Sequence, residues 1–241
     1  MHQNGEVEAN NALNHLYDEN DGCRICHTKH LVRASAMKND PHTHECSKNQ
    51  EPEDSRNNVI LATTTSAKNW SELTENIENS LMTLHTDSVD LYQFEAENFL
   101  PLPNQEDRIY ETLVELKKKG KIKHFGIVTT DFELAKKAIE SDLYETLQFP
   151  FSVVNSDYAS DLIKMCEEHD VGFIAMQPLG GGLLENIPIA YGFLNQYESV
   201  VPIWGVKSLE ELNQILYFRE HPPVIDETFQ KDVEKIRSFF N

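Results

Sequence analysis

Four side chains near the start of the sequence are of the types that bind metal ions. Cys23 and Cys26 form a C-x-x-C pair, and His42 and Cys46 follow further along the chain. Thiolate and imidazole groups are the ligands of tetrahedral zinc, so these residues predict a zinc site, although their spacing matches no standard zinc finger closely. The run C-R-I-C-H also spells the c-type haem attachment motif, which requires export, and a polar segment without a ligand is the third interpretation.

A carboxylate, Glu95, ends the short apolar run 90–94, which lies between two helical patterns. Such a run is typical of a buried parallel strand, and the carboxyl ends of parallel strands line the active face of an α/β protein. Thr64 lies near the end of the preceding apolar run, 59–65. A carboxylic acid kept neutral in an apolar pocket can hydrogen-bond an oxyanion, so Glu95 is a catalytic candidate, whereas Thr64, the second candidate, offers only a hydroxyl.

The loop 205–208 has the features of an anion site. Ser208 and Glu211 form the capping box S-x-x-E, which marks the start of a helix. That helix N-terminus offers free N–H groups and a positive dipole end, and Lys207 adds a charge suited to a 2′-phosphate. The alternative is that Ser208 and the glycines 180–182 are ordinary cap and turn residues.

The elements that must position these side chains repeat along the chain. Strand patterns begin near residues 59, 90, 123, 145, 171 and 199, and each is followed by a helical pattern. This repeat predicts an α/β fold of the (β/α)8 TIM-barrel type, with six βα units clear and the N-terminal units degenerate or missing. A doubly wound sheet is the alternative, but no G-x-G-x-x-G follows the first strand.

Composition divides the chain and excludes some partners. Residues 1–58 hold six of the ten histidines and three of the four cysteines, so we expect a polar, partly disordered or metal-binding segment before a barrel over 59–241. The net charge of -19 disfavours nucleic acid and anionic membranes as partners. No run approaches the roughly 20 apolar residues of a membrane span, and no signal peptide is recognisable, so we expect a cytoplasmic protein.

Six runs of the sequence resemble the aldo/keto reductase family, and in particular the branch that carries a C-terminal ferredoxin-like domain. The resemblance implies a (β/α)8 barrel that reduces a small carbonyl or an enone with NADPH or NADH. No cysteine follows Cys166, so no iron–sulfur cluster is expected. The runs are Val59 to Thr65, Thr86 to Phe94, Lys119 to Ile127, Thr146 to Ser152, Gly172 to Leu184 and Pro202 to Leu212.

The resemblance also assigns roles to residues. The family's catalytic tetrad is Asp, Tyr, Lys and His. Here Thr64 stands in place of the Lys, and Glu95 stands in place of the His; a Glu at the position of the His resembles the steroid double-bond reductases of the family. The Asp and Tyr have no recognisable equivalent, although Tyr17 and Asp18 lie in the N-terminal segment. The residues that the resemblance assigns to the cofactor are Thr129, Gln148, Met176, Gly205, Lys207, Ser208 and Glu211.

Two functions are therefore expected from the sequence. The first is an NAD(P)H-dependent oxidoreductase with weak or altered activity, because the groups that tune and supply the proton are missing. The second is a catalytically inactive nucleotide-binding or regulatory subunit on the same scaffold. An incomplete barrel leaves strand edges unpaired, which would favour a homo-oligomer or a partner chain at that edge.

Overall fold

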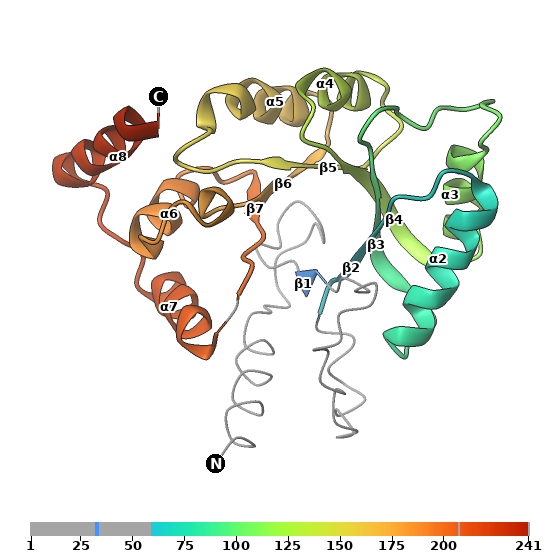
Figure 1. The fold of residues 1–241 in the computed structure, drawn as a ribbon, viewed down its shortest axis with the longest axis horizontal. Helices are drawn as coiled ribbons and strands as arrows, with labels where there is room; N and C mark the ends of the chain where they lie inside the picture. Colours follow the sequence, from blue (N-terminus) through green and yellow to red (C-terminus); the bar gives the residue numbers. More distant parts are fainter. Residues whose placement is uncertain (1–31, 34–58, 207, 241) are drawn as a thin grey trace, which may run out of the picture.

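The computed structural model describes residues 32–33, 59–206 and 208–240 (Figure 1). The proposed metal ligands Cys23, Cys26, His42 and Cys46 lie outside the described residues, and so does Lys207. The division between residues 1–58 and 59–241 therefore stays a prediction.

The described strands form one parallel sheet in which every strand pairs with its neighbour in sequence. A doubly wound sheet reverses its strand order at a switch point, so the unbroken order excludes that alternative and fits a barrel. The short first strand was not expected from the sequence. The strands are β1 (Val32–Arg33), β2 (Leu61–Thr65), β3 (Val89–Glu95), β4 (Ile122–Val128), β5 (Thr146–Pro150), β6 (Gly172–Met176) and β7 (Val200–Pro202).

Helices lie around the convex side of the arc that the strands form (Figure 1). Among their N-cap residues, Asn69, Asp131, Asn186 and Ser208 accept a backbone N–H of the first turn with their side chains. The sequence pattern predicts the helix starts at Asn69, Asp131 and Ser208. The helices are α2 (Trp70–Thr83), α3 (Ile109–Lys118), α4 (Phe132–Glu140), α5 (Ser156–Glu168), α6 (Ile187–Leu194), α7 (Leu209–Glu220) and α8 (Glu227–Phe240), with a 3-10 turn, η2 (Gly180–Gly182).

Alternate residues of each strand face opposite sides of the sheet. Tyr92 and Phe94 of β3 are buried in the large core shared with the helices, whereas Leu91 belongs to a small cluster on the concave side with Ala62 and Ile174. Because strand side chains alternate, Gln93 and Glu95 share the concave face with Leu91. The residues singled out at the ends of the strands therefore face the inside of the arc.

An ion-pair cluster joins α3, β4 and β5 at the amino ends of the strands. Glu145 accepts hydrogen bonds from Lys117 Nζ at 2.8 Å and from His124 Nδ1 at 2.5 Å. Burial alone would raise the pKa of Glu145, but these two bonds outweigh it and hold the pKa below its ordinary value. The stability from this cluster is therefore present above the ordinary glutamate pKa and is lost as the pH falls through the lowered one.

The last helix, α8, packs on α6 rather than on the sheet. A Cβ on Gly192 would lie 2.7 Å from the ring of Phe229, so only glycine lets the two helices approach this closely. Arg237 donates to Val153 O at 3.3 Å and to Ser156 Oγ at 2.5 Å, and its guanidinium lies 5.4 Å from the ring centroid of Phe193. These contacts attach α8 to α6 and to the start of α5.

Candidate functional site

The two catalytic candidates are in contact. In the β2–β3 register Thr64 pairs with Gln93, so Glu95 lies one step further toward the carboxyl edge on the same face. Thr64 Oγ1 donates a hydrogen bond to Glu95 Oε1 at 2.7 Å, and both residues are partly exposed. A hydroxyl bonded to a carboxylate is a strong, directional pair, so the hydroxyl hydrogen of Thr64 points at Glu95.

Buried polar side chains form a row across the concave face beside this pair: in the strand register Gln93 and Thr146 are level with Thr64, and Gln148 is level with Glu95. Gln93, Thr146 and Gln148 have no exposed surface. Among the described residues, no hydrogen-bond partner is found for either amide atom of Gln93, for Thr146 Oγ1 or for Gln148 Oε1. Buried polar atoms are normally paired, and leaving one unpaired costs about 1–3 kcal/mol, so each of these atoms requires an explanation.

Gly126 is the residue that allows this row to form. It lies between Gln93 and Thr146 in the strand register. An ideal Cβ built on Gly126 would lie 1.9 Å from Thr146 Oγ1 and 2.5 Å from Thr146 O. The side chain of Thr146 thus occupies the space above the glycine, which no other residue type at position 126 would leave free.

Three of the predicted cofactor residues come together at the ends of β4, β5 and β6. The Thr129 N–H donates to Gln148 O at 3.1 Å, and Thr129 Oγ1 accepts from the Asp131 N–H at 3.1 Å. Gln148 Nε2 lies 3.6 Å from Met176 Sδ, a weak contact that orients the amide. Thr129, Gln148 and Met176 thus lie together on the same edge of the sheet as Glu95.

The loop after β7 leads into α7 as the capping box predicts. Ser208 is the N-cap and its Oγ accepts from the Glu211 N–H at 3.1 Å. A Cβ on Gly205 would meet no atom of the described residues within 4 Å, so this part of the chain leaves the space beside the glycine open. The amides of the first turn of this twelve-residue helix are available to an anion, whereas the side chain of Lys207 lies outside the described residues.

The best-packed tyrosines do not face the concave side. Tyr92 is buried between sheet and helices, and burial raises its pKa. Tyr110 and Tyr144 pack edge-to-face on Phe125 in the same outer layer. None of these three hydroxyls is placed to donate a proton beside Glu95.

Within 59–206, 208–240 and the β1 pair, no three His, Cys, Asp or Glu side chains are grouped closely enough to hold a metal ion. No helix in that part of the chain is long and apolar enough to cross a membrane.

A parallel sheet in barrel order, with amide, hydroxyl and carboxylate groups at one edge, defines a βα-barrel protein whose candidate site lies at the carboxyl ends of the strands. The chain belongs to the aldo/keto reductase family: the model of that family matches residues 38–188. The family resemblance seen in the sequence is confirmed.

One relative with a curated description matches part of this chain. The uncharacterized oxidoreductase YqkF of Bacillus subtilis (strain 168) is 25% identical over 147 residues, which are 56% of this chain and 46% of that protein. The match thus spans less than half the length of that relative.

Two solved structures show the same fold. The apo aldo-keto reductase AKR11C1 of Bacillus halodurans has 19% identity and a TM-score of 0.62, covering 75% of this chain and 72% of that one. An aldo-keto reductase of Klebsiella pneumoniae in complex with NADPH has 19% identity and a TM-score of 0.61, covering 76% of this chain and 71% of that one. The predicted fold class is confirmed.

Proposed function

We propose that this chain is an oxidoreductase that binds NADPH or NADH at the carboxyl edge of its sheet. The observation that carries the proposal is Gln148, whose Oε1 is buried and has no partner among the described residues. The carboxamide of a nicotinamide offers the N–H that would satisfy this oxygen. The likeness to the Klebsiella pneumoniae structure that contains NADPH supports the choice of cofactor.

The surrounding residues fit such a group. Thr129 anchors the main chain of Gln148, and Met176 lies where it would cover a flat ring. At the other end, the N-terminus of α7 would accept a phosphate, with Ser208 and Glu211 shaping the first turn and Gly205 leaving the approach open. Lys207 is proposed to pair with a 2′-phosphate. The bound cofactor supplies a hydride, and the residues named here bind and orient it.

We further propose that reduction of ordinary carbonyl substrates is weak or altered. A positioned proton donor contributes roughly 10² to 10⁴ in rate. Thr64 has no charge where the family has a lysine, and its hydroxyl is bonded to Glu95 Oε1. Glu95 is the acidic group nearest to this hydroxyl, so turnover that depends on it should be lost in Glu95→Gln. Small aldehydes, quinones and enones are the substrates to be tested.

The Thr64–Glu95 contact also favours the second candidate function, an inactive nucleotide-binding or regulatory subunit. A site that binds the cofactor but lacks a proton donor with a suitable pKa would report whether the cofactor is bound rather than catalyse a reaction. We also propose that the chain is related to the branch of the family that carries a C-terminal ferredoxin-like domain. A homo-oligomer or a partner chain at the barrel edge is proposed as well.

Cofactor binding is tested by titrating the full chain with NADPH and with NADH and following the nucleotide fluorescence. Gln148→Leu should weaken both nucleotides, whereas Gln230→Leu, on the exposed side of α8, should change neither. Lys207→Glu should weaken NADPH more than NADH, because only NADPH carries the additional phosphate. No binding of either nucleotide to the wild type would refute the proposal.

Catalysis is tested separately by NADPH oxidation with small aldehydes, quinones and enones across a range of pH. The expected result is slow turnover that is lost in Glu95→Gln. Fast turnover of a simple aldehyde that survives Glu95→Gln would show that the catalytic groups lie elsewhere. Binding without turnover on any of these substrates would favour the regulatory function.

Zinc binding by Cys23, Cys26, His42 and Cys46 remains a proposal from the sequence. Protein prepared without added metal should contain about one zinc per chain by elemental analysis. Cys23→Ala and Cys26→Ala should remove it. A wild-type protein with only traces of zinc would rule the site out.

A further inference from the structure

Arg237, near the end of α8, contacts the connection between β5 and α5. Its Nη2 donates to Ser156 Oγ at 2.5 Å, and its Nε donates to Val153 O at 3.3 Å. Its guanidinium also lies 5.4 Å from the ring centroid of Phe193, on α6. Hydrogen bonds from a charged donor are strong, and a planar guanidinium holds its acceptors in a fixed arrangement. One side chain thus joins the C-terminal helix to the segment 151–156.

The first residue of that segment is bonded to the end of β6. Phe151 follows β5 directly, and its N–H donates to Met176 O at 3.1 Å. Gln148, which the proposed function assigns to the nicotinamide, lies three positions before Phe151, and its Nε2 lies 3.6 Å from Met176 Sδ. The position of Met176, and with it the orientation of the Gln148 amide, therefore depends on Phe151.

The ring of Phe151 is fully buried and packs on the ring that Arg237 covers. Its centroid lies 5.4 Å from that of Phe193 and 6.0 Å from that of Phe173, on β6. Phe193 thus contacts both Arg237 and Phe151. Because a protein interior is close-packed, a shift of one of these groups displaces its neighbours.

The same segment also supports the turn after β6. A Cβ on Gly180 would lie 2.7 Å from Val154 Cγ2, so the turn η2 approaches the residue that follows Val153. Ser152 Oγ donates to Asn155 Oδ1 at 2.7 Å, and the Asn155 N–H donates to Ser152 O at 3.2 Å. These bonds make the segment a compact unit, so a displacement of it would reach the carboxyl ends of both β5 and β6.

We propose that Arg237 is a positioning residue for the nicotinamide end of the cofactor. By holding the segment 151–156, it fixes Met176 and the amide of Gln148 in the geometry that the nicotinamide requires. Arg237 acts through these contacts rather than by touching the ligand. Small displacements matter at such a site, since a misplacement of about 1 Å can reduce a rate by roughly 10²-fold. The inference rests on the proposed function for the identity of the ligand.

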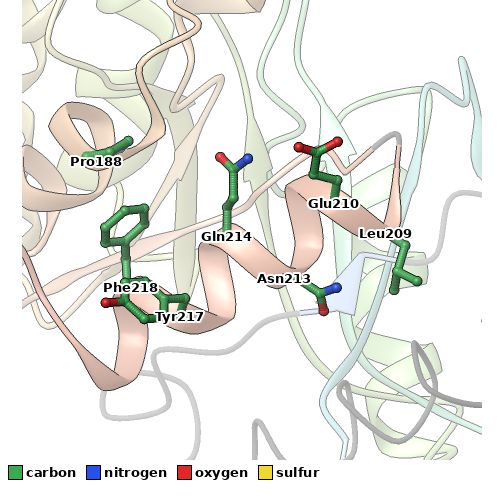
Figure 2. Close-up of a pocket in the computed structure, with 7 residues that line it drawn as sticks. All are labelled: Pro188, Leu209, Glu210, Asn213, Gln214, Tyr217 and Phe218. Carbon is green, nitrogen blue, oxygen red and sulfur yellow. The ribbon is translucent and has the colours of Figure 1, made fainter.

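The phosphate end of the cofactor is proposed to lie elsewhere, at the start of α7. A pocket of about 580 Å³ continues from there along the helix, and its lining includes Pro188, Leu209 and Phe218 (Figure 2). Arg237 and the segment 151–156 do not line this pocket. A change at Arg237 should therefore weaken the binding of the nicotinamide end and leave the phosphate end unaffected.

The first test titrates the full chain with NADPH and with adenosine 2′,5′-bisphosphate, which lacks the nicotinamide. Arg237→Met keeps an apolar side chain of similar length but removes the donors, so it should bind NADPH about tenfold more weakly and the bisphosphate as the wild type does. Arg237→Lys should also weaken NADPH, because an ammonium group lacks the planar fork of donors. Lys235→Met is the matched control, because Lys235 is an exposed cation of the same helix, and it should change neither affinity.

Two results of these titrations would overturn the proposal. Equal weakening of both probes in Arg237→Met would show that Arg237 only stabilises the fold, and an unchanged NADPH affinity would show that it does not position the site. If the wild type bound no NADPH, the proposed function would be refuted, and a measurement without ligand would decide the role of Arg237.

That measurement is NMR of the ligand-free full chain, which reports on the side-chain amide of Gln148 and on the methyl group of Met176. Both resonances should shift in Arg237→Met and in Arg237→Lys, and both should stay in place in Lys235→Met. Resonances that stay in place in the two Arg237 variants would show that α8 does not determine the geometry at the ends of β5 and β6, and the proposal would fail whether or not NADPH binds.

Discussion

Replacing Gly126 by alanine tests the strand register that assembles the candidate site. The new Cβ would lie 1.9 Å from Thr146 Oγ1 and 2.5 Å from Thr146 O, far inside contact distance. A rotation of the Thr146 side chain would relieve the first clash. The second clash is with the main chain of β5, so the two strands must separate locally.

The loss of stability in Gly126→Ala follows from these contacts. Overpacking of a well-packed interior costs about 1–3 kcal/mol, and each ladder hydrogen bond that is stretched adds about 0.5–1.5 kcal/mol. Alanine in a strand recovers about 0.5–1 kcal/mol of stability relative to glycine, because glycine loses more conformational entropy when the chain folds. We therefore expect Gly126→Ala to lower the free energy of unfolding by about 2–4 kcal/mol.

Gly205→Ala is the matched control, because a Cβ there meets no atom within 4 Å and should change stability by less than about 0.5 kcal/mol. Urea unfolding followed by tryptophan fluorescence and by circular dichroism gives both values, provided that the two transitions coincide. If Gly126→Ala were as stable as Gly205→Ala, β4 and β5 would not be in the register described. The arrangement of the buried polar side chains in a row would then be refuted as well.

Three further changes test other features. Gln93→Met should raise the free energy of unfolding by about 1–3 kcal/mol, because it removes, at similar volume, two buried polar atoms that have no partner among the described residues; a loss of stability would show that the amide has partners. Gly192→Ala should destabilise by about 1–3 kcal/mol through its clash with Phe229, and hydrogen exchange in α8 should increase. Glu145→Gln should be less stable than the wild type at neutral pH, with a difference that shrinks as the pH falls below about 4.5; a constant difference would refute the lowered pKa.

Sequence reasoning succeeds where the signal is local. The caps at Asn69, Asp131 and Ser208 depend on residues within one helical turn, and all three are seen. The placement of Glu95 at a carboxyl edge follows from one apolar run, and it holds. The contact between Thr64 and Glu95 joins residues 31 positions apart, and only the register of β2 on β3 establishes it.

Other features were missed for identifiable reasons. β1 has two residues within a polar segment, too short to show any periodicity. α8 did carry a signal, since Phe229, Val233 and Ile236 repeat at helical spacing and contact the core. The need for glycine at position 126 has no local signal, because the atoms that exclude a side chain belong to Thr146 on the next strand.

The attachment of α8 has a consequence for synthesis of the chain. Arg237 contacts Val153, Ser156 and Phe193, all of which leave the ribosome well before it. Phe193 precedes Arg237 by 44 positions, and at about 5–20 residues per second this corresponds to a delay of roughly 2–9 s. During most of that interval the surface of α6 at Gly192 that later receives Phe229 is uncovered, so this part of the core closes only when the last helix has been made.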